Sequence, residues 1–261
     1  MNERPVISFD GTALHVREEG RVGQPTVLLS HSLGGTLRMW DSLTAALAPA
    51  FRVIRWDSRG HGRSQAPVGA YSVETLGKDT LAVMDELGVK KAHFVGLSKG
   101  GMTGMWLAAS DPQRIDKLVL ANTTAYIPGK NVLEGLMKTA LQEGVAEIAP
   151  KTLHGWLGDT FKRAHPAAVG ELVREMAAMT PVGYAASVAV LRDVDLREAV
   201  RKIIAETLVI AGIEDGPRGV DAAEFLAAAI PRARRVNLAA GHLSPVENPA
   251  AFNTAVLEFL R

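Results

Sequence analysis

The hydrophobic residues of this chain form short continuous runs that alternate with stretches in which apolar positions recur every three or four residues. Five largely apolar runs are typical of strands buried on both faces of a parallel sheet; they cover residues 26–30, 51–56, 92–95, 118–121 and 207–211. The spaced pattern predicts amphipathic helices between them, at about 37–47, 72–87, 99–110, 221–230 and 249–261. This alternation predicts a parallel, doubly wound α/β sheet with right-handed crossovers.

Two weaker patterns extend the predicted sheet at its ends. Residues 5–9 and 14–17 flank the turn dipeptide Asp10-Gly11 and predict an opening β-hairpin. Residues 234–238 predict a last strand, which is followed by a loop at 239–243. The sheet is therefore expected to include an opening hairpin and a last strand before the helix at 249–261.

The alternation stops after Asn122. No strand-like run occurs from about Tyr126 to Val194. Helical patterns replace the strands there, separated by prolines; they lie near 131–148, 150–157, 166–179 and 181–191. We therefore expect a core formed by residues 1–124 and 195–261, with residues 125–194 inserted as a helical lid. The plain alternative is a set of ordinary surface helices.

Length, composition and charge restrict the kind of protein this chain can be and the kinds of partner it can bind. A length of 261 residues suits one large domain or one domain with an insertion, and 47% hydrophobic residues is ordinary for a soluble protein. The net charge of +1 gives no electrostatic case for nucleic acid or an anionic membrane. No apolar run approaches the roughly 20 residues of a membrane helix. We expect a cytoplasmic protein that acts on a small molecule; a homo-oligomer is compatible with the sequence.

The strongest chemical signal is a serine between two glycines, Gly96-Leu97-Ser98-Lys99-Gly100, at a strand-to-helix junction. This is the G-x-S-x-G nucleophile elbow, in which a sharp turn lifts a serine hydroxyl above the sheet. Side chains at 96 and 100 would crowd the turn, and the backbone of Ser98 should be strained. The pattern predicts Ser98 as a nucleophile, against the plain alternative of a Gly–Ser loop. Because the chain has no cysteine, a thiol nucleophile and thiolate metal sites are excluded.

A serine nucleophile needs a base, and the base needs a third group that orients it. Among seven histidines, His242 follows the last predicted strand in a loop, directly after Gly241. For the orienting acid, Asp215 and Glu214 compete in the loop after residues 207–211, and the shorter Asp215 at its outer end is preferred. These loops should meet, because ligands bind at the carboxyl ends of parallel strands.

The reaction also needs donors for a developing oxyanion. We expect one from the backbone N–H of Lys99 and one from Leu33, in the loop after the strand at 26–30. His31 is expected to brace this loop. No cofactor or metal is needed for such chemistry. An apolar pocket under the lid is predicted from four residues, namely Trp156, Met102, Met137 and Leu153.

Four segments together resemble the α/β-hydrolase superfamily over essentially the whole chain: 31–34, 57–64, 96–101 and 241–244. Within it the chain most closely resembles the 3-oxoadipate enol-lactonases, through the elbow and the segments 118–123, 183–186 and 241–247. The resemblance implies the α/β-hydrolase fold and the triad order Ser98, Asp215, His242. It also implies hydrolysis of a small lactone that carries a carboxylate, in the breakdown of aromatic compounds.

The chain departs from that family at three places. Methionine commonly follows the nucleophile where this chain has Lys99, proline is usual where it has Glu206, and residues 215–218 differ. The Lys99 ammonium could attract a substrate carboxylate or bias the oxyanion site; alternatively it is a solvated or snorkelling lysine whose backbone alone matters. Other functions therefore stay open. They are a general esterase for small acyl groups, a cofactor-free perhydrolase or haloperoxidase-like enzyme, a carbon–carbon bond hydrolase, and a receptor that binds without turnover.

Overall fold

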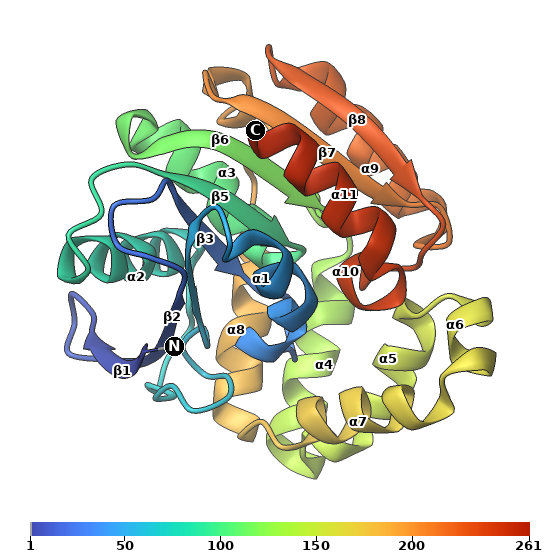
Figure 1. Ribbon diagram of the computed structural model, residues 1–261. Helices are drawn as coiled ribbons and strands as arrows, with labels where there is room; N and C mark the ends of the chain where they lie inside the picture. Colours follow the sequence, from blue (N-terminus) through green and yellow to red (C-terminus); the bar gives the residue numbers. More distant parts are fainter. Residues whose placement is uncertain (1) are drawn as a thin grey trace.

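An eight-stranded sheet forms the centre of the computed structural model, which describes residues 2–261 apart from the side chains at positions 217 and 218 (Figure 1). The strand order is β1-β2-β4-β3-β5-β6-β7-β8. The strands from β3 to β8 run parallel, while β2 pairs antiparallel with both β1 and β4. The predicted parallel, doubly wound sheet with an opening hairpin is confirmed.

Most of the strands agree with the apolar runs of the sequence to within two residues. Their bounds are β1 (Asn2–Ile7), β2 (Ala13–Glu19), β3 (Thr26–Ser30), β4 (Arg52–Trp56), β5 (Ala92–Leu97), β6 (Ile115–Ala121), β7 (Glu206–Gly212) and β8 (Ala233–Leu238). Strand β6 begins three residues before the predicted run at 118–121, because the polar pair Asp116-Lys117 hides the buried Ile115 from an apolar pattern. Strand β1 likewise starts earlier than predicted, with most of its side chains exposed.

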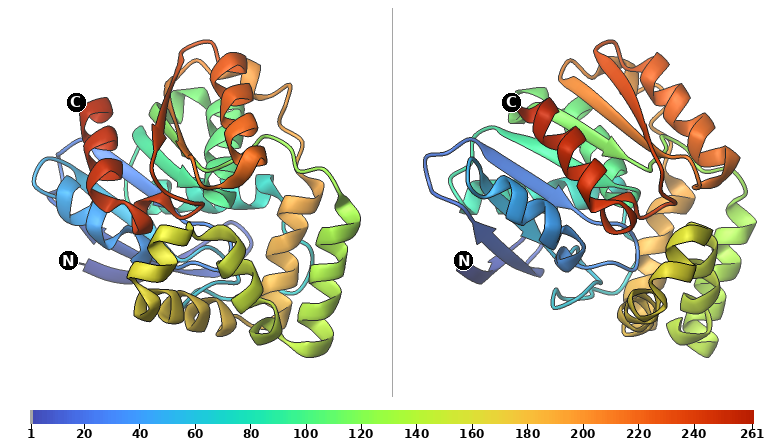
Figure 2. Two further views of the ribbon diagram at one scale, coloured as in Figure 1. Left: turned by 90° about the vertical axis from the view of Figure 1, so that its right-hand side faces the viewer. Right: turned by 45° about the vertical axis from the view of Figure 1, so that its right-hand side comes forward.

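Helices cover both faces of the sheet. The core contains η1 (Leu37–Trp40), α1 (Asp41–Leu47), α2 (Val73–Glu86), α3 (Lys99–Ser110), η2 (Pro112–Arg114), η4 (Val200–Lys202), α9 (Gly216–Ala229), α10 (Ser244–Glu247) and α11 (Pro249–Leu260). Helices α1 and α11 pack together on one face, and α2, α3 and α9 lie on the other (Figures 1 and 2). Ser72 caps α2 as predicted, since its hydroxyl accepts the N–H of Thr75.

Three helix predictions need correction. The segment predicted as one helix at 131–148 is divided at Gly144 into α4 (Lys130–Glu143) and the 3₁₀ turn η3 (Val145–Glu147). The segment 37–47 is divided into a 3₁₀ turn and a separate α1. Helix α9 begins at Gly216 rather than 221; the Gly-Pro pair suggested a loop, although proline is tolerated in the first helical turn. Within residues 2–261, no helix combines the length and apolarity needed to cross a membrane.

The segment between β6 and β7 is helical and lies beyond the carboxyl ends of the strands (Figure 2). It contains α4 (Lys130–Glu143), η3 (Val145–Glu147), α5 (Ala149–Trp156), α6 (Asp159–Ala164), α7 (Pro166–Ala177) and α8 (Pro181–Asp193); the short α6 was not predicted. Where the chain leaves and re-enters the core, Tyr126 pairs with Asp195 in an isolated antiparallel bridge, and the N–H of Leu196 donates to the carbonyl of Ala125 (2.8 Å). The role of this segment as a lid stays a prediction.

Candidate active site

The elbow at Ser98 has the strained geometry that its glycines predict. Ser98 lies between β5 and α3 with φ 54° and ψ −116°, a conformation that non-glycine residues rarely adopt. A Cβ at Gly96 would collide with the backbone of Gly100, and a Cβ at Gly100 would collide with the Ser30 carbonyl. Neighbouring groups hold the turn: the N–H of Ser98 donates to the Ala121 carbonyl (2.9 Å). The hydroxyl of Ser98 is thereby presented at the carboxyl edge of the sheet.

His242 and Asp215 form a direct pair at the same edge. His242 Nδ1 lies 2.9 Å from both carboxylate oxygens of Asp215. An imidazole that donates its Nδ1–H to a carboxylate keeps Nε2 free to accept a proton. The competing acid, Glu214, is exposed at the exit of β7, and no bond between its side chain and His242 is present among the described residues. Of the two acids, the structure therefore pairs Asp215 with His242.

One pocket of about 390 Å³ brings Ser98, Asp215 and His242 to a common wall. The predicted pocket residues Met102 and Trp156 also line it, and the indole of Trp156 lies 4.9 Å from the imidazole of His242. The other two predictions, Leu153 and Met137, are not among its described lining residues. Leu153 points into the buried core, and the sulfur of Met137 lies 3.9 Å from the Arg192 guanidinium. Amphipathic spacing places both side chains inward but does not say toward which cavity.

Asn122 is a site residue that the sequence pattern did not reveal. It follows β6 with φ 45°, and its amide nitrogen donates to Asp215 Oδ2 (3.0 Å) and to the Gly241 carbonyl (3.1 Å). Its amide oxygen accepts the hydroxyl of Ser244 (2.6 Å). Asn122 thus ties the acid to the loop that carries His242. A polar residue at the carboxyl end of the strand between β5 and β7, of a type that tolerates positive φ, is the signal that could have found it.

Two buried histidines brace the loop after β3. The Nε2 of His31 accepts the N–H of Ser58 (2.9 Å), and the Nε2 of His61 accepts the N–H of Gly34 (3.1 Å). Each Nδ1 faces a backbone carbonyl, so both imidazoles carry their proton on Nδ1 and are neutral. Burial lowers the pKa of His31 to about 3 and holds the pKa of His61 well below its usual value. His31 therefore braces the loop, as predicted.

The two predicted oxyanion donors lie in this braced loop and in the elbow. Leu33 lies in the loop itself, and Lys99 is the first residue of α3, where backbone N–H groups have no partner inside the helix. Neither N–H donates a hydrogen bond to another group within residues 2–261. Neither residue is among the described residues that line the pocket of Ser98, and their role as oxyanion donors stays a prediction.

Comparison with known proteins agrees with this fold. The model of the alpha/beta hydrolase fold family matches residues 25–249. The chain belongs to this family. It is 35% identical to 3-oxoadipate enol-lactonase 2 of Acinetobacter baylyi, over 97% of both chains. It is 30% identical to a putative carbamate hydrolase RutD of Caulobacter segnis, also over 97% of both chains.

Among solved structures, the enol-lactonase from Burkholderia xenovorans LB400 superposes on this alpha/beta hydrolase with a TM-score of 0.93 and 36% identity. The alignment covers 98% of this chain and 99% of that chain. The resemblance noted in the sequence to the α/β hydrolases and their enol-lactonases is therefore confirmed. The fold and these relatives support hydrolase activity.

Lys99 is buried in this alpha/beta hydrolase, and the expectation that it is solvated or snorkelling is wrong. Its side chain is 1% exposed, and its Nζ has no hydrogen-bond partner within residues 2–261. Burial lowers the pKa of Lys99 to about 7, and the negative charge of Asp79 opposes this shift. Lys99 is not among the described residues that line the pocket of Ser98. The structure therefore gives no support for a contact between its ammonium and a substrate in that pocket.

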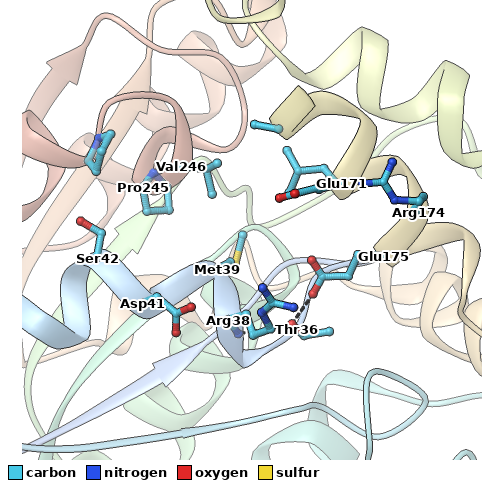
Figure 3. Close-up of a pocket in the computed structure, with 13 residues that line it drawn as sticks. Thr36, Arg38, Met39, Asp41, Ser42, Glu171, Arg174, Glu175, Pro245 and Val246 are labelled. Carbon is cyan, nitrogen blue, oxygen red and sulfur yellow. Dashed lines mark hydrogen bonds between the residues drawn. The ribbon is translucent and has the colours of Figure 1, made fainter. Parts of the chain in front are cut away.

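A second and larger cavity of about 710 Å³ lies between η1, α1, α7 and α10 of the hydrolase (Figure 3). Its charged side chains are of both signs and include Arg38, Arg174 and Glu175. Thr36 bonds to Glu175 across it, and burial raises the pKa of Glu175. None of Ser98, Asp215 and His242 lines this cavity, so the smaller pocket is the candidate active site.

Proposed function

We propose that this protein is a serine hydrolase that cleaves a small carboxylic ester or lactone through an acyl-enzyme. The proposal rests mainly on one observation: a single pocket is lined by Ser98, Asp215 and His242, which follow three different strands. The hydrogen-bonded His242–Asp215 pair and the strained elbow support it further. Residues 125–194 form the lid of this pocket over a core of residues 1–124 and 195–261, since Gly155 and Trp156 supply part of its wall.

Each of these residues has a separate role in the proposed reaction. Ser98 Oγ attacks the carbonyl carbon while Nε2 of His242 takes its proton, and the N–H groups of Leu33 and Lys99 stabilise the oxyanion. Collapse of the tetrahedral intermediate breaks the bond to the leaving oxygen, which receives the proton from His242. In a lactone this leaving group stays tethered to the acyl chain. Water then attacks the acyl carbon while Nε2 of His242 takes its proton. Collapse of this second tetrahedral intermediate breaks the bond to Ser98 Oγ, which regains a proton from His242 as the acid is released, and Asp215 maintains the required tautomer throughout.

For the substrate, we propose 3-oxoadipate enol-lactone or a close analogue, supported by the enol-lactonase relatives at 35% and 36% identity. One observation favours a second candidate, an esterase for uncharged acyl groups. Apart from His242, the charged residues among the described lining residues are Asp215 and Asp221, and both are acidic. Acidic side chains on this described part of the wall disfavour a substrate carboxylate.

A substrate panel tests these proposals. The protein is assayed with 3-oxoadipate enol-lactone, short p-nitrophenyl esters, a carbamate, and bromide with peroxide, and a fluorophosphonate probe is mapped by mass spectrometry. We expect labelling of Ser98 and the highest kcat/KM on the enol-lactone. Higher values on uncharged esters would select the esterase, and peroxide-dependent bromination would select the perhydrolase. Tight ligand binding without turnover or labelling would contradict the proposal and support a receptor.

Replacing Asn122 should impair catalysis more than substrate binding. In Asn122→Ala the bonds to Asp215 and to the Gly241 carbonyl are lost, and a hydrogen bond to a charged group contributes about 1.5–3 kcal/mol. We expect kcat to fall by about tenfold or more, with KM little changed. Because alanine at positive φ adds strain, Asn122→Gly serves as the control for the backbone. Wild-type kcat in both variants would contradict a positioning role for Asn122.

A further inference from the structure

The carboxylate of Glu247 joins two segments that are far apart in the sequence. Its Oε2 accepts the N–H groups of Gly241 (3.0 Å) and Gly158 (2.8 Å), and its Oε1 accepts the N–H of Leu243 (2.9 Å). Gly241 and Leu243 flank His242 in the histidine loop, residues 239–243. Gly158 belongs to the lid turn, residues 156–158, which connects α5 to α6. One side chain of α10 therefore holds both the proposed base and the lid.

The lid turn also touches the histidine loop directly. The N–H of His242 donates to the carbonyl of Trp156 (2.7 Å). A Cβ at Gly241 would lie 2.5 Å from that carbonyl oxygen and 2.6 Å from the nitrogen of Gly158. Only glycine at position 241 allows two backbones to approach so closely. The contact is therefore made by backbone groups, which cannot adjust by rotating a side chain.

Glu247 completes a set of restraints on His242. On the core side, Asp215 fixes Nδ1 of the imidazole, and Asn122 holds the Gly241 carbonyl. On the lid side, the backbone N–H groups on either side of His242 end on the carboxylate of Glu247. Hydrogen bonds to an ionised acceptor are stronger than neutral ones. Loss of the carboxylate would leave the N–H groups of Gly241, Leu243 and Gly158 without this acceptor.

We propose that Glu247 is a positioning residue that couples the lid turn to the orientation of His242, so that the base is in place only while the lid turn rests on the histidine loop. The inference rests on the proposed function, because it gives His242 the role of the base. It assigns Glu247 no contact with substrate. The lid thereby becomes part of the catalytic machinery as well as a wall of the pocket.

The variant Glu247→Gln tests the coupling with little change of size. An amide has one acceptor oxygen and directs its NH₂ group at one or two of the three N–H groups. We expect kcat for a short p-nitrophenyl ester to fall by about 10- to 100-fold while KM changes by less than about threefold. Hydrogen exchange should accelerate in peptides that cover the lid turn and in peptides that cover the histidine loop, both together. Peptides from β3 and α11 should keep their wild-type exchange.

Controls separate coupling from general damage. Glu258→Gln removes an exposed carboxylate from the neighbouring α11 and should change neither kcat nor exchange. Gly241→Ala keeps Glu247 but inserts a methyl group between the lid turn and the histidine loop, and should reproduce the joint effect. Wild-type kcat in Glu247→Gln, faster exchange in only one of the two segments, or faster exchange throughout the chain would each overturn the proposal. Absence of turnover and of Ser98 labelling in the wild type would refute the proposed function instead, and the exchange comparison would still decide the coupling.

Discussion

Replacing Ser98 by alanine is expected to lower kcat for ester or lactone hydrolysis by about 10⁴-fold or more. The reason is chemical, since without Oγ no acyl-enzyme forms, and only the oxyanion donors and substrate binding remain. The elbow should survive the change, because the glycines at 96 and 100 that permit the turn are untouched. Single-turnover kinetics with a p-nitrophenyl ester, together with mass spectrometry of the quenched protein, measures both the rate and the acyl adduct.

The matched control for this variant is Ser110→Ala, at the exposed end of the same helix α3. It should keep wild-type turnover and the adduct. Thermal unfolding of both variants distinguishes a loss of activity from a loss of the fold. Wild-type turnover in Ser98→Ala would show that the serine mechanism is wrong.

Replacing Lys99 by methionine is expected to stabilise the fold, most strongly at neutral and acidic pH. The folded protein gives up the Lys99 proton at a pKa of about 7, whereas the usual value is 10.5. Between these values the unfolded chain binds more protons than the folded one, so the stability of the wild type rises with pH across this window and is lowest below pH 7. A shift of this size corresponds to about 5 kcal/mol, an upper limit for the gain in Lys99→Met at pH 6. The gain should shrink toward pH 10.

Urea unfolding at pH 6, 8 and 10 measures this difference. Lys151→Met, which removes an exposed lysine of α5, is the control and should leave the pH dependence unchanged. If the free energy of unfolding had the same pH dependence in Lys99→Met and in the wild type, the predicted destabilisation by the buried ammonium would be wrong. The same variant, assayed on the enol-lactone, reports whether the charge next to Ser98 matters for turnover.

Ser98, Asp215 and His242 could be proposed as neighbours from the sequence because each lies in the turn or loop that follows a strand, at β5, β7 and β8, and parallel strands bring their carboxyl ends together. Strand positions were themselves readable, since β3 and β5 are buried on both faces and consist of apolar runs. Where polar residues interrupt a strand, as at the start of β6, the pattern of apolar residues did not predict the strand's first residues. The four residues of α10 are too few to show any helical period.

The supporting residues could not be found in this way. Asn122 meets Asp215 across 93 positions of sequence, and Glu247 meets Gly158 across 89. Such contacts depend on how loops pack against one another, which no local spacing encodes. The burial of Lys99 has the same origin: the groups whose charges interact with its ammonium, His31, His61 and Asp79, belong to three other segments. The sequence showed that Lys99 is unusual but not that water is kept away from it.

The bridge between Tyr126 and Asp195 has a consequence for how this fold can diversify. Because the chain leaves and re-enters the core at touching residues, a segment of another length can be inserted there with little loop-closure cost, since each doubling of length adds only about 0.6 kcal/mol. The pocket wall can therefore be exchanged while the strands that precede Ser98, Asp215 and His242 remain as they are. A grafted segment would have to meet one local condition, namely a backbone carbonyl and a backbone N–H presented to the loop of His242 and to Glu247.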